Sequence, residues 1–127
     1  MIASLAAAAM LAKLPVLTGD FDHDGRPDRA ELRKRGGGYE LIVTRASAPR
    51  HPHVVFSMKR LGDFYLDKAR PGRWKTACGK GYGPDEGHCT HRFVTLRGDT
   101  LDFGFKESSE AVALWTGKRF ETVWLSD

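Results

Sequence analysis

The chain has 127 residues, of which 41% are hydrophobic and 28% charged. This composition predicts one globular domain and excludes an intrinsically disordered chain. The net charge is +4, but Lys and Arg are spread along the chain with acidic residues near them. We therefore expect a generally basic surface and do not expect nucleic acid as a partner. No sequence repeat with a period of about 20–50 residues is visible, which argues against a propeller or solenoid.

Residues 1–12 (MIASLAAAAMLA) are apolar and uncharged. The run is too short to span a bilayer as a helix, so no transmembrane anchor is expected. It is typical of the hydrophobic region of a secretory signal, although no basic residue precedes Lys13. Two interpretations stay open: a signal peptide, which we favour, or a short N-terminal helix. Residues 13–127 are expected to form a single β domain.

The segment from Gly19 to Glu31 (GDFDHDGRPDRAE) holds five of the 16 acidic residues of the chain. Carboxylates recur at alternate positions and are followed by Gly25, which permits the sharp turn of a calcium loop. Without an ion, carboxylates about 4 Å apart would repel by roughly 1 kcal/mol per pair even in water. We therefore predict a calcium site whose ligands are four carboxylates and one main-chain carbonyl: Asp20, Asp22, Asp24, Asp28 and the carbonyl of Arg26.

The same segment matches the written EF-hand pattern, because Glu31 stands at the twelfth position. A true EF-hand needs a helix on each side of its loop. Pro15 lies upstream, and only residues 30–35 separate the loop from three glycines downstream, which is too short for a stable helix. The flanks therefore predict a strand–loop–strand site, in which Asp28 closes the ligand shell and Glu31 belongs to the next strand.

Gly19–Ala30, GDFDHDGRPDRA, resembles the calcium loop of FG-GAP-type and VCBS-type repeats, written G-D-F-(D/N)-x-D-G-x-x-D-x-A. In such repeats the loop joins two strands of an extracellular β-propeller blade, and Asp residues at these positions hold calcium. The resemblance implies the same ligands as the spacing does. It covers about a dozen residues in a single copy, so it does not imply a propeller. The remainder of the chain looks like uncharacterised small exported bacterial proteins that carry one such loop.

Short strands are predicted along the rest of the chain. Residues 30–35 and 39–45 flank three glycines and suggest a hairpin, and residues 111–115 and 119–125 flank a second turn. Arg97-Gly98-Asp99 indicates a turn between two further alternating segments. The other candidate strands are residues 53–59, 64–68, 91–97 and 100–105. The fold class is mainly β, a compact antiparallel sandwich or partly open barrel.

Cys78 and Cys89 bracket a ten-residue, glycine-rich loop. A disulfide would stabilise this loop by about 3 kcal/mol and would fit an oxidising compartment. A zinc site with His88 and His91 is the alternative, but the spacing matches no usual ligand pattern. The closed loop is also the best candidate for a recognition surface, through four side chains: Lys80, Tyr82, Asp85 and Glu86.

No nucleophile or phosphate-binding motif is present in the sequence. The predicted function is an exported, periplasmic or secreted, non-catalytic calcium-binding β domain that binds a protein or a cell-envelope polymer. An immunity or inhibitor protein against an exported toxin or hydrolase is one alternative, and a purely structural calcium domain is another. A hydrolase with an unrecognised site is the last alternative, and it requires a concave polar pocket with perturbed titratable groups.

Overall fold

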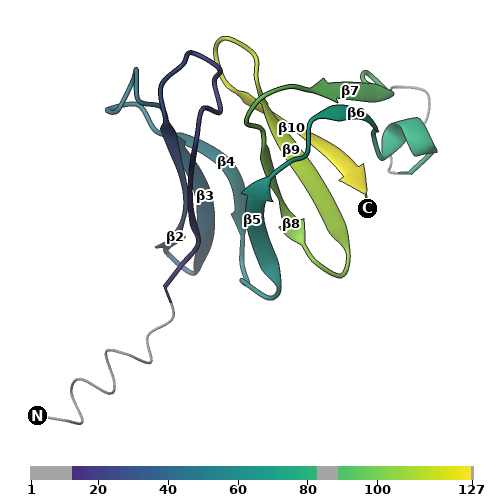
Figure 1. Cartoon of the computed structure of the whole chain (residues 1–127). Coiled ribbons are helices and arrows are strands. Elements are labelled where there is room, and N and C mark those ends of the chain that lie inside the picture. Colours follow the sequence, from purple (N-terminus) through teal and green to yellow (C-terminus); the bar gives the residue numbers. More distant parts are fainter. Residues whose placement is uncertain (1–12, 83–88, 127) are drawn as a thin grey trace, which may run out of the picture.

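The computed structural model describes residues 13–82 and 89–126, which form two facing antiparallel sheets (Figure 1). The first sheet has the order β1-β2-β3-β4 and the second the order β10-β9-β8-β5. The strands of the first sheet are β1 (Val16–Gly19), β2 (Asp28–Arg35), β3 (Gly38–Thr44) and β4 (His53–Met58). Those of the second are β5 (Phe64–Lys68), β8 (Leu101–Phe105), β9 (Ser109–Trp115) and β10 (Phe120–Ser126).

Tight turns set the register of both predicted hairpins. Arg35 pairs with Gly38, which leaves a two-residue turn, and Gly36 in that turn has a φ of 56° that favours glycine. Phe120 pairs with Trp115 across the second turn. Because the side chains of a strand alternate between faces, these registers bring the apolar residues of neighbouring strands to the same side.

The main core lies between the two sheets. Phe103 of β8 is fully buried there and stacks near Phe56 and Phe64, with ring centroids 5.4 and 6.4 Å apart. The sheets also approach each other at an edge, where Thr122 of β10 donates a hydrogen bond to the carbonyl of Val55 in β4 at 3.4 Å. The arrangement is a sandwich and not a closed barrel, which confirms the predicted fold class.

A third, two-stranded sheet was missed by the sequence prediction. β6 (Gly72–Lys75) pairs with β7 (Phe93–Leu96), and the connection between them begins with the 3-10 helix η1 (Cys78–Lys80). Residues 91–97 therefore do not form a hairpin with residues 100–105, because β8 pairs with β5 and β9 instead. The β6–β7 hairpin packs on the outer face of the second sheet and closes a smaller apolar cluster there: Val94, Leu96, Val112, Val123 and Leu125.

In the described part of the chain, no helix has the length and apolar character needed to span a bilayer. Residues 1–12, for which a signal peptide or a short helix was predicted, lie outside the described residues.

Phe103→Ala should lower the free energy of unfolding by about 3–5 kcal/mol, because it removes a fully buried ring and leaves a cavity between the sheets. Urea denaturation measures this loss. The matched control is Val54→Ala in β4, whose side chain is 53% exposed and whose effect should stay within about 0.5 kcal/mol. Equal effects of the two substitutions would contradict the assignment of the core.

Candidate metal centre

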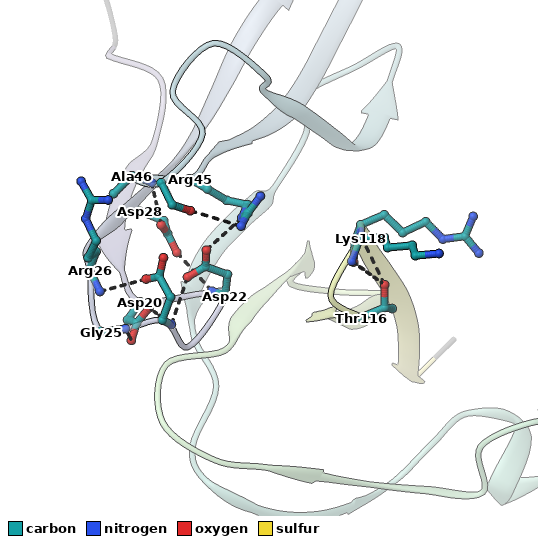
Figure 2. A network of polar contacts seen from close by, with 12 residues as sticks. Asp20, Asp22, Gly25, Arg26, Asp28, Arg45, Ala46, Thr116 and Lys118 are labelled. Atoms are coloured by element: carbon teal, nitrogen blue, oxygen red, sulfur yellow. Dashed lines mark hydrogen bonds and ion pairs between the residues drawn. The ribbon is translucent and has the colours of Figure 1, made fainter.

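Three of the four predicted carboxylate ligands converge. Asp20, Asp22 and Asp28 each offer one oxygen, and these atoms all lie within 4.8 Å of one another. Calcium–oxygen bonds are about 2.4 Å long, so two ligands of one ion lie at most about 5 Å apart. The three oxygens therefore have a spacing that one calcium ion can bridge. Figure 2 shows the three side chains gathered inside the curve of the loop.

The loop joins β1 to β2, and its ends are closed by the cross-strand pair Gly19 and Asp28. Phe21 anchors it, because its ring is 1% exposed and belongs to the core between the sheets. Two residues then take left-handed backbone conformations, His23 with a φ of 58° and Gly25 with a φ of 89°. A left-handed conformation has no steric cost for Gly25, which lacks a Cβ atom. For His23 the same conformation is sterically unfavourable. The structure is thus strand–loop–strand, as the flanks predicted.

Backbone amides hold the loop in shape. The carboxylate of Asp20 accepts hydrogen bonds from the amides of Asp24 at 3.0 Å and Gly25 at 2.8 Å. The carboxylate of Asp24 accepts one from the amide of Arg26 at 2.9 Å, and Asp24 does not belong to the converging group. The structure therefore brings three of the predicted side-chain ligands together and leaves Asp24 exposed beside them.

Asp28 is the most buried of the three carboxylates. It accepts hydrogen bonds from the amides of Ala46 at 2.9 Å and Asp22 at 3.1 Å. Burial raises the pKa of Asp28, and the negative charge of Asp22 raises it further. The two amide hydrogen bonds lower the pKa, but the net shift is upward. Asp28 thus joins the loop to the residues that follow β3, which sequence spacing alone did not indicate.

Arg45 balances the charge of Asp22. Its Nε donates to the Asp22 carboxylate at 2.8 Å, and its guanidinium lies 4.0 Å from the ring centroid of Trp115 in β9. Burial favours the neutral form of Asp22, but the Arg45 ion pair and hydrogen bonds outweigh it and hold the pKa of Asp22 below its ordinary value. The other Asp22 oxygen accepts a hydrogen bond from the amide of Asp24 at 3.3 Å. Arg45 was not identified from the sequence, because nothing local relates it to Asp22.

Asp99 was missed for the same reason. Its carboxylate accepts a hydrogen bond from the amide of Asp20 at 2.9 Å, although the two residues are 79 positions apart. Its carbonyl lies 2.7 Å from Nε2 of His23, and its carboxylate pairs with Lys68 at 3.7 Å. Asp99 precedes β8, so these contacts attach the acidic loop to the second sheet.

Glu31 lies in β2, as predicted, and points away from the candidate metal centre. Its carboxylate forms ion pairs with Arg29 at 3.3 Å and with Arg33. Burial favours the neutral form, but these arginines outweigh it and lower the pKa of Glu31. Glu31 is therefore a surface ion-pair residue, and the twelfth-position match to an EF-hand has no counterpart in the fold.

The predicted disulfide between Cys78 and Cys89 is present, with the two Cα atoms 5.6 Å apart. Both thiols are used in it, so the zinc alternative fails. Of the proposed recognition residues, Tyr82 is 57% exposed, whereas Lys80 donates to the Leu125 carbonyl at 2.9 Å. Lys80 thus fastens η1 to β10. Asp85 and Glu86 lie outside the described residues.

A concave polar pocket of about 690 Å³ opens beside β5, β8 and β9. Tyr65 lines it and donates a hydrogen bond to Asp102 at 2.9 Å. Burial, together with a hydrogen bond to Glu110, raises the pKa of Asp102 to about 7, and burial also raises the pKa of Tyr65. Of these two groups with raised pKa values, Tyr65 lines the pocket and Asp102 does not. Among the described residues that line it there is no histidine or cysteine.

Comparisons with protein-family models, with curated proteins and with solved structures found no match to this chain.

Asp102 should make stability depend on pH. Its pKa of about 7 in the fold lies above the ordinary 3.8, so the unfolded chain loses this proton first and the contribution of Asp102 to stability falls as pH rises from about 4 through about 7. Asp102→Asn should remove this pH-dependent contribution to the free energy of unfolding. Urea denaturation of both proteins at pH 4.5 and 7.5 measures the difference.

The control for this experiment is Glu107→Gln, because Glu107 is an exposed acid in the turn that connects β8 to β9. It should follow the wild-type pH dependence. If the gap in stability between wild type and Asp102→Asn is the same at both pH values, Asp102 is already ionised at the lower one and the assignment is wrong.

Proposed function

We propose that the chain is an exported, calcium-stabilised β domain that acts by binding another macromolecule and not by catalysis. The observation that carries the calcium part is the convergence of Asp20, Asp22 and Asp28 within one loop. Oxygen-only donors suit calcium, whereas zinc prefers nitrogen and sulfur. The likeness of residues 19–30 to FG-GAP-type and VCBS-type calcium loops agrees with this ligand set.

The proposed ion has a structural purpose. Asp20, Asp22 and Asp28 would supply carboxylate oxygens, and Asp24 and the carbonyl of Arg26 are the remaining proposed ligands. A divalent cation would neutralise carboxylates of which two are buried, Asp22 and Asp28. Because the same loop is attached to residues after β3 and before β8, the ion would fix the end of the sandwich where both sheets meet.

Export and partner binding have separate support. The Cys78–Cys89 disulfide is typical of oxidising compartments, and the apolar residues 1–12 are typical of a secretory signal. Calcium is plentiful outside the cytosol. Binding of a protein or a cell-envelope polymer is favoured over catalysis because no nucleophile–base pair was recognised in the sequence. Neutralisation of an exported toxin or hydrolase is one form that protein binding would take.

The pocket beside Tyr65 favours a second candidate, a hydrolase. Tyr65 lines this pocket and donates a hydrogen bond to Asp102, whose raised pKa of about 7 would suit a general acid acting through Tyr65. Screening nitrophenyl glycosides, esters and phosphates tests this function. Turnover that is abolished by Asp102→Asn and kept by Glu107→Gln would favour it over the binding domain.

Removing calcium should lower the melting temperature. Calcium at 100-fold above its dissociation constant adds about 2.7 kcal/mol of stability, which corresponds to a shift on the order of 10 °C for a domain of this size. Differential scanning calorimetry with calcium and with excess EGTA measures the shift. Asp28→Asn should reduce it strongly, because it removes the charge of a converging ligand.

The matched control is Glu31→Gln, which removes a carboxylate of the same segment that lies outside the converging group. It should keep the full calcium shift. The calcium proposal fails if excess EGTA leaves the melting temperature of a demonstrably calcium-loaded protein unchanged. Equal loss of the shift in both variants would instead return Glu31 to the ligand set.

A further inference from the structure

The positive charge of the chain is concentrated in one segment. The segment from Lys68 to Arg97 contains seven Lys and Arg residues and two acidic residues. The rest of the chain contains 13 Lys and Arg residues and 14 acidic residues. The two acids, Asp85 and Glu86, lie outside the described residues. The whole net charge of +4 therefore originates in the segment that forms the β6–β7 hairpin.

This hairpin is inserted into a sheet that is continuous without it. β5 pairs directly with β8, with Leu66 opposite Phe103, so the second sheet does not need β6 or β7 to complete its ladder. Figure 1 shows β6 and β7 lying across the strands of this sheet, at one end of the sandwich. An inserted element that is clamped by a disulfide is a suitable place for a binding surface on a rigid scaffold.

The two faces of the hairpin differ in character. Trp74, Val94 and Leu96 point toward the second sheet and belong to its outer apolar cluster. The alternate residues of the same strands are exposed, and they form what we call the outer hairpin face: Arg73, Lys75, Phe93 and Thr95. The hairpin thus uses its apolar side for attachment and presents its basic side to solvent.

The cations of this face are held in place by an aromatic ring. Lys75 stands opposite Phe93 in the ladder, and Arg73 stands opposite Thr95. The Arg73 guanidinium lies 3.9 Å from the Phe93 ring centroid, and the Lys75 ammonium lies 6.0 Å from it. Exposed Arg92 and Arg97 flank the strand β7.

None of these four cations takes part in an ion pair with another described residue. By contrast, Arg33 and Arg35 of β2 and Arg45, which follows β3, each pair with a carboxylate. Within the part of the chain that the structure describes, these four cations therefore have no counter-charge to displace when they accept an anionic ligand.

We propose that the outer hairpin face, with the flanking Arg92 and Arg97, is the docking surface of this domain for a linear, phosphate-bearing polymer of the cell envelope. The inference rests on the proposed function and names the partner within it. Successive outward residues of a strand are about 7 Å apart, so the face presents a row of separate cations to a row of separate anions. Arginine provides the forked donors that match phosphate oxygens.

The same geometry disfavours other anionic partners. Phe93 is 42% exposed but has a guanidinium over its ring, so it offers no free platform for stacking a nucleic-acid base. The hairpin belongs to a disulfide-bonded element, which is typical of oxidising compartments. An acidic protein would require apolar anchors at the centre of its interface, and the centre of this face is occupied by cations.

The test uses poly(glycerol phosphate), a phosphodiester polymer, with calcium-loaded protein at constant free calcium. Isothermal titration calorimetry at 50 and 200 mM salt should show binding that weakens steeply with salt, because counterions are released. The triple variant Arg73→Ala, Lys75→Ala, Arg97→Ala should bind about tenfold more weakly or worse, with a shallower salt dependence.

The matched control is the triple variant Arg50→Ala, Lys59→Ala, Arg60→Ala. It removes the same formal charge from exposed positions outside the hairpin, and its affinity should stay within about twofold of wild type. Arg73→Lys with Arg97→Lys, which keeps the charge but loses the forked donors, should bind with an affinity between those of wild type and the hairpin triple variant.

Four results would overturn the proposal. Equal weakening by both triple variants would mean that net charge, and not this face, causes binding. Poly-L-glutamate that binds as tightly as the phosphodiester polymer would indicate an acidic protein, and single-stranded DNA that binds at least tenfold more tightly would indicate nucleic acid. Wild-type protein that keeps its calcium-dependent melting shift and does not bind poly(glycerol phosphate) would end this inference alone, and the calcium proposal would stand.

Discussion

The ion pair between Arg45 and Asp22 allows an acidic loop to lie against an apolar sandwich. Asp22 is buried, and an unpaired buried carboxylate is strongly unfavourable. Because Arg45 also lies over the ring of Trp115, its guanidinium joins the loop of the first sheet to a strand of the second. The position of the converging aspartates relative to both sheets therefore depends on one side chain that follows β3.

The acidic loop and both predicted hairpins could be inferred from sequence because their determinants are local. The alternation of Asp20, Asp22 and Asp24 with Gly25 specifies a curled loop, and Gly36 specifies a two-residue turn. Arg45 and Asp99 could not be inferred in this way, since each meets the loop only through tertiary contacts. The predicted ligand Asp24 illustrates the limit, because spacing does not reveal that its carboxylate turns to the Arg26 amide.

The β6–β7 hairpin escaped prediction for a topological reason. Residues 91–97 and 100–105 both alternate, and the sequence predicts a turn between them. In the structure the two segments belong to different sheets. Phe93–Leu96 pairs with β6, a four-residue strand whose only apolar side chain is Trp74. The gathering of Arg73 and Lys75 on one exposed face could not be predicted, because it follows from the pairing of β6 with β7.

The insertion between β5 and β8 separates two kinds of evolutionary constraint. Val112, Val123 and Leu125 need an apolar cover, so the hairpin cannot be deleted without exposing them to water. The outward side chains of the hairpin are free of this requirement, because they contact neither the β5–β8 ladder nor the main core. A hairpin with the same inward pattern and a different outward one can therefore replace it, and the sandwich becomes a frame on which new specificities can be grafted.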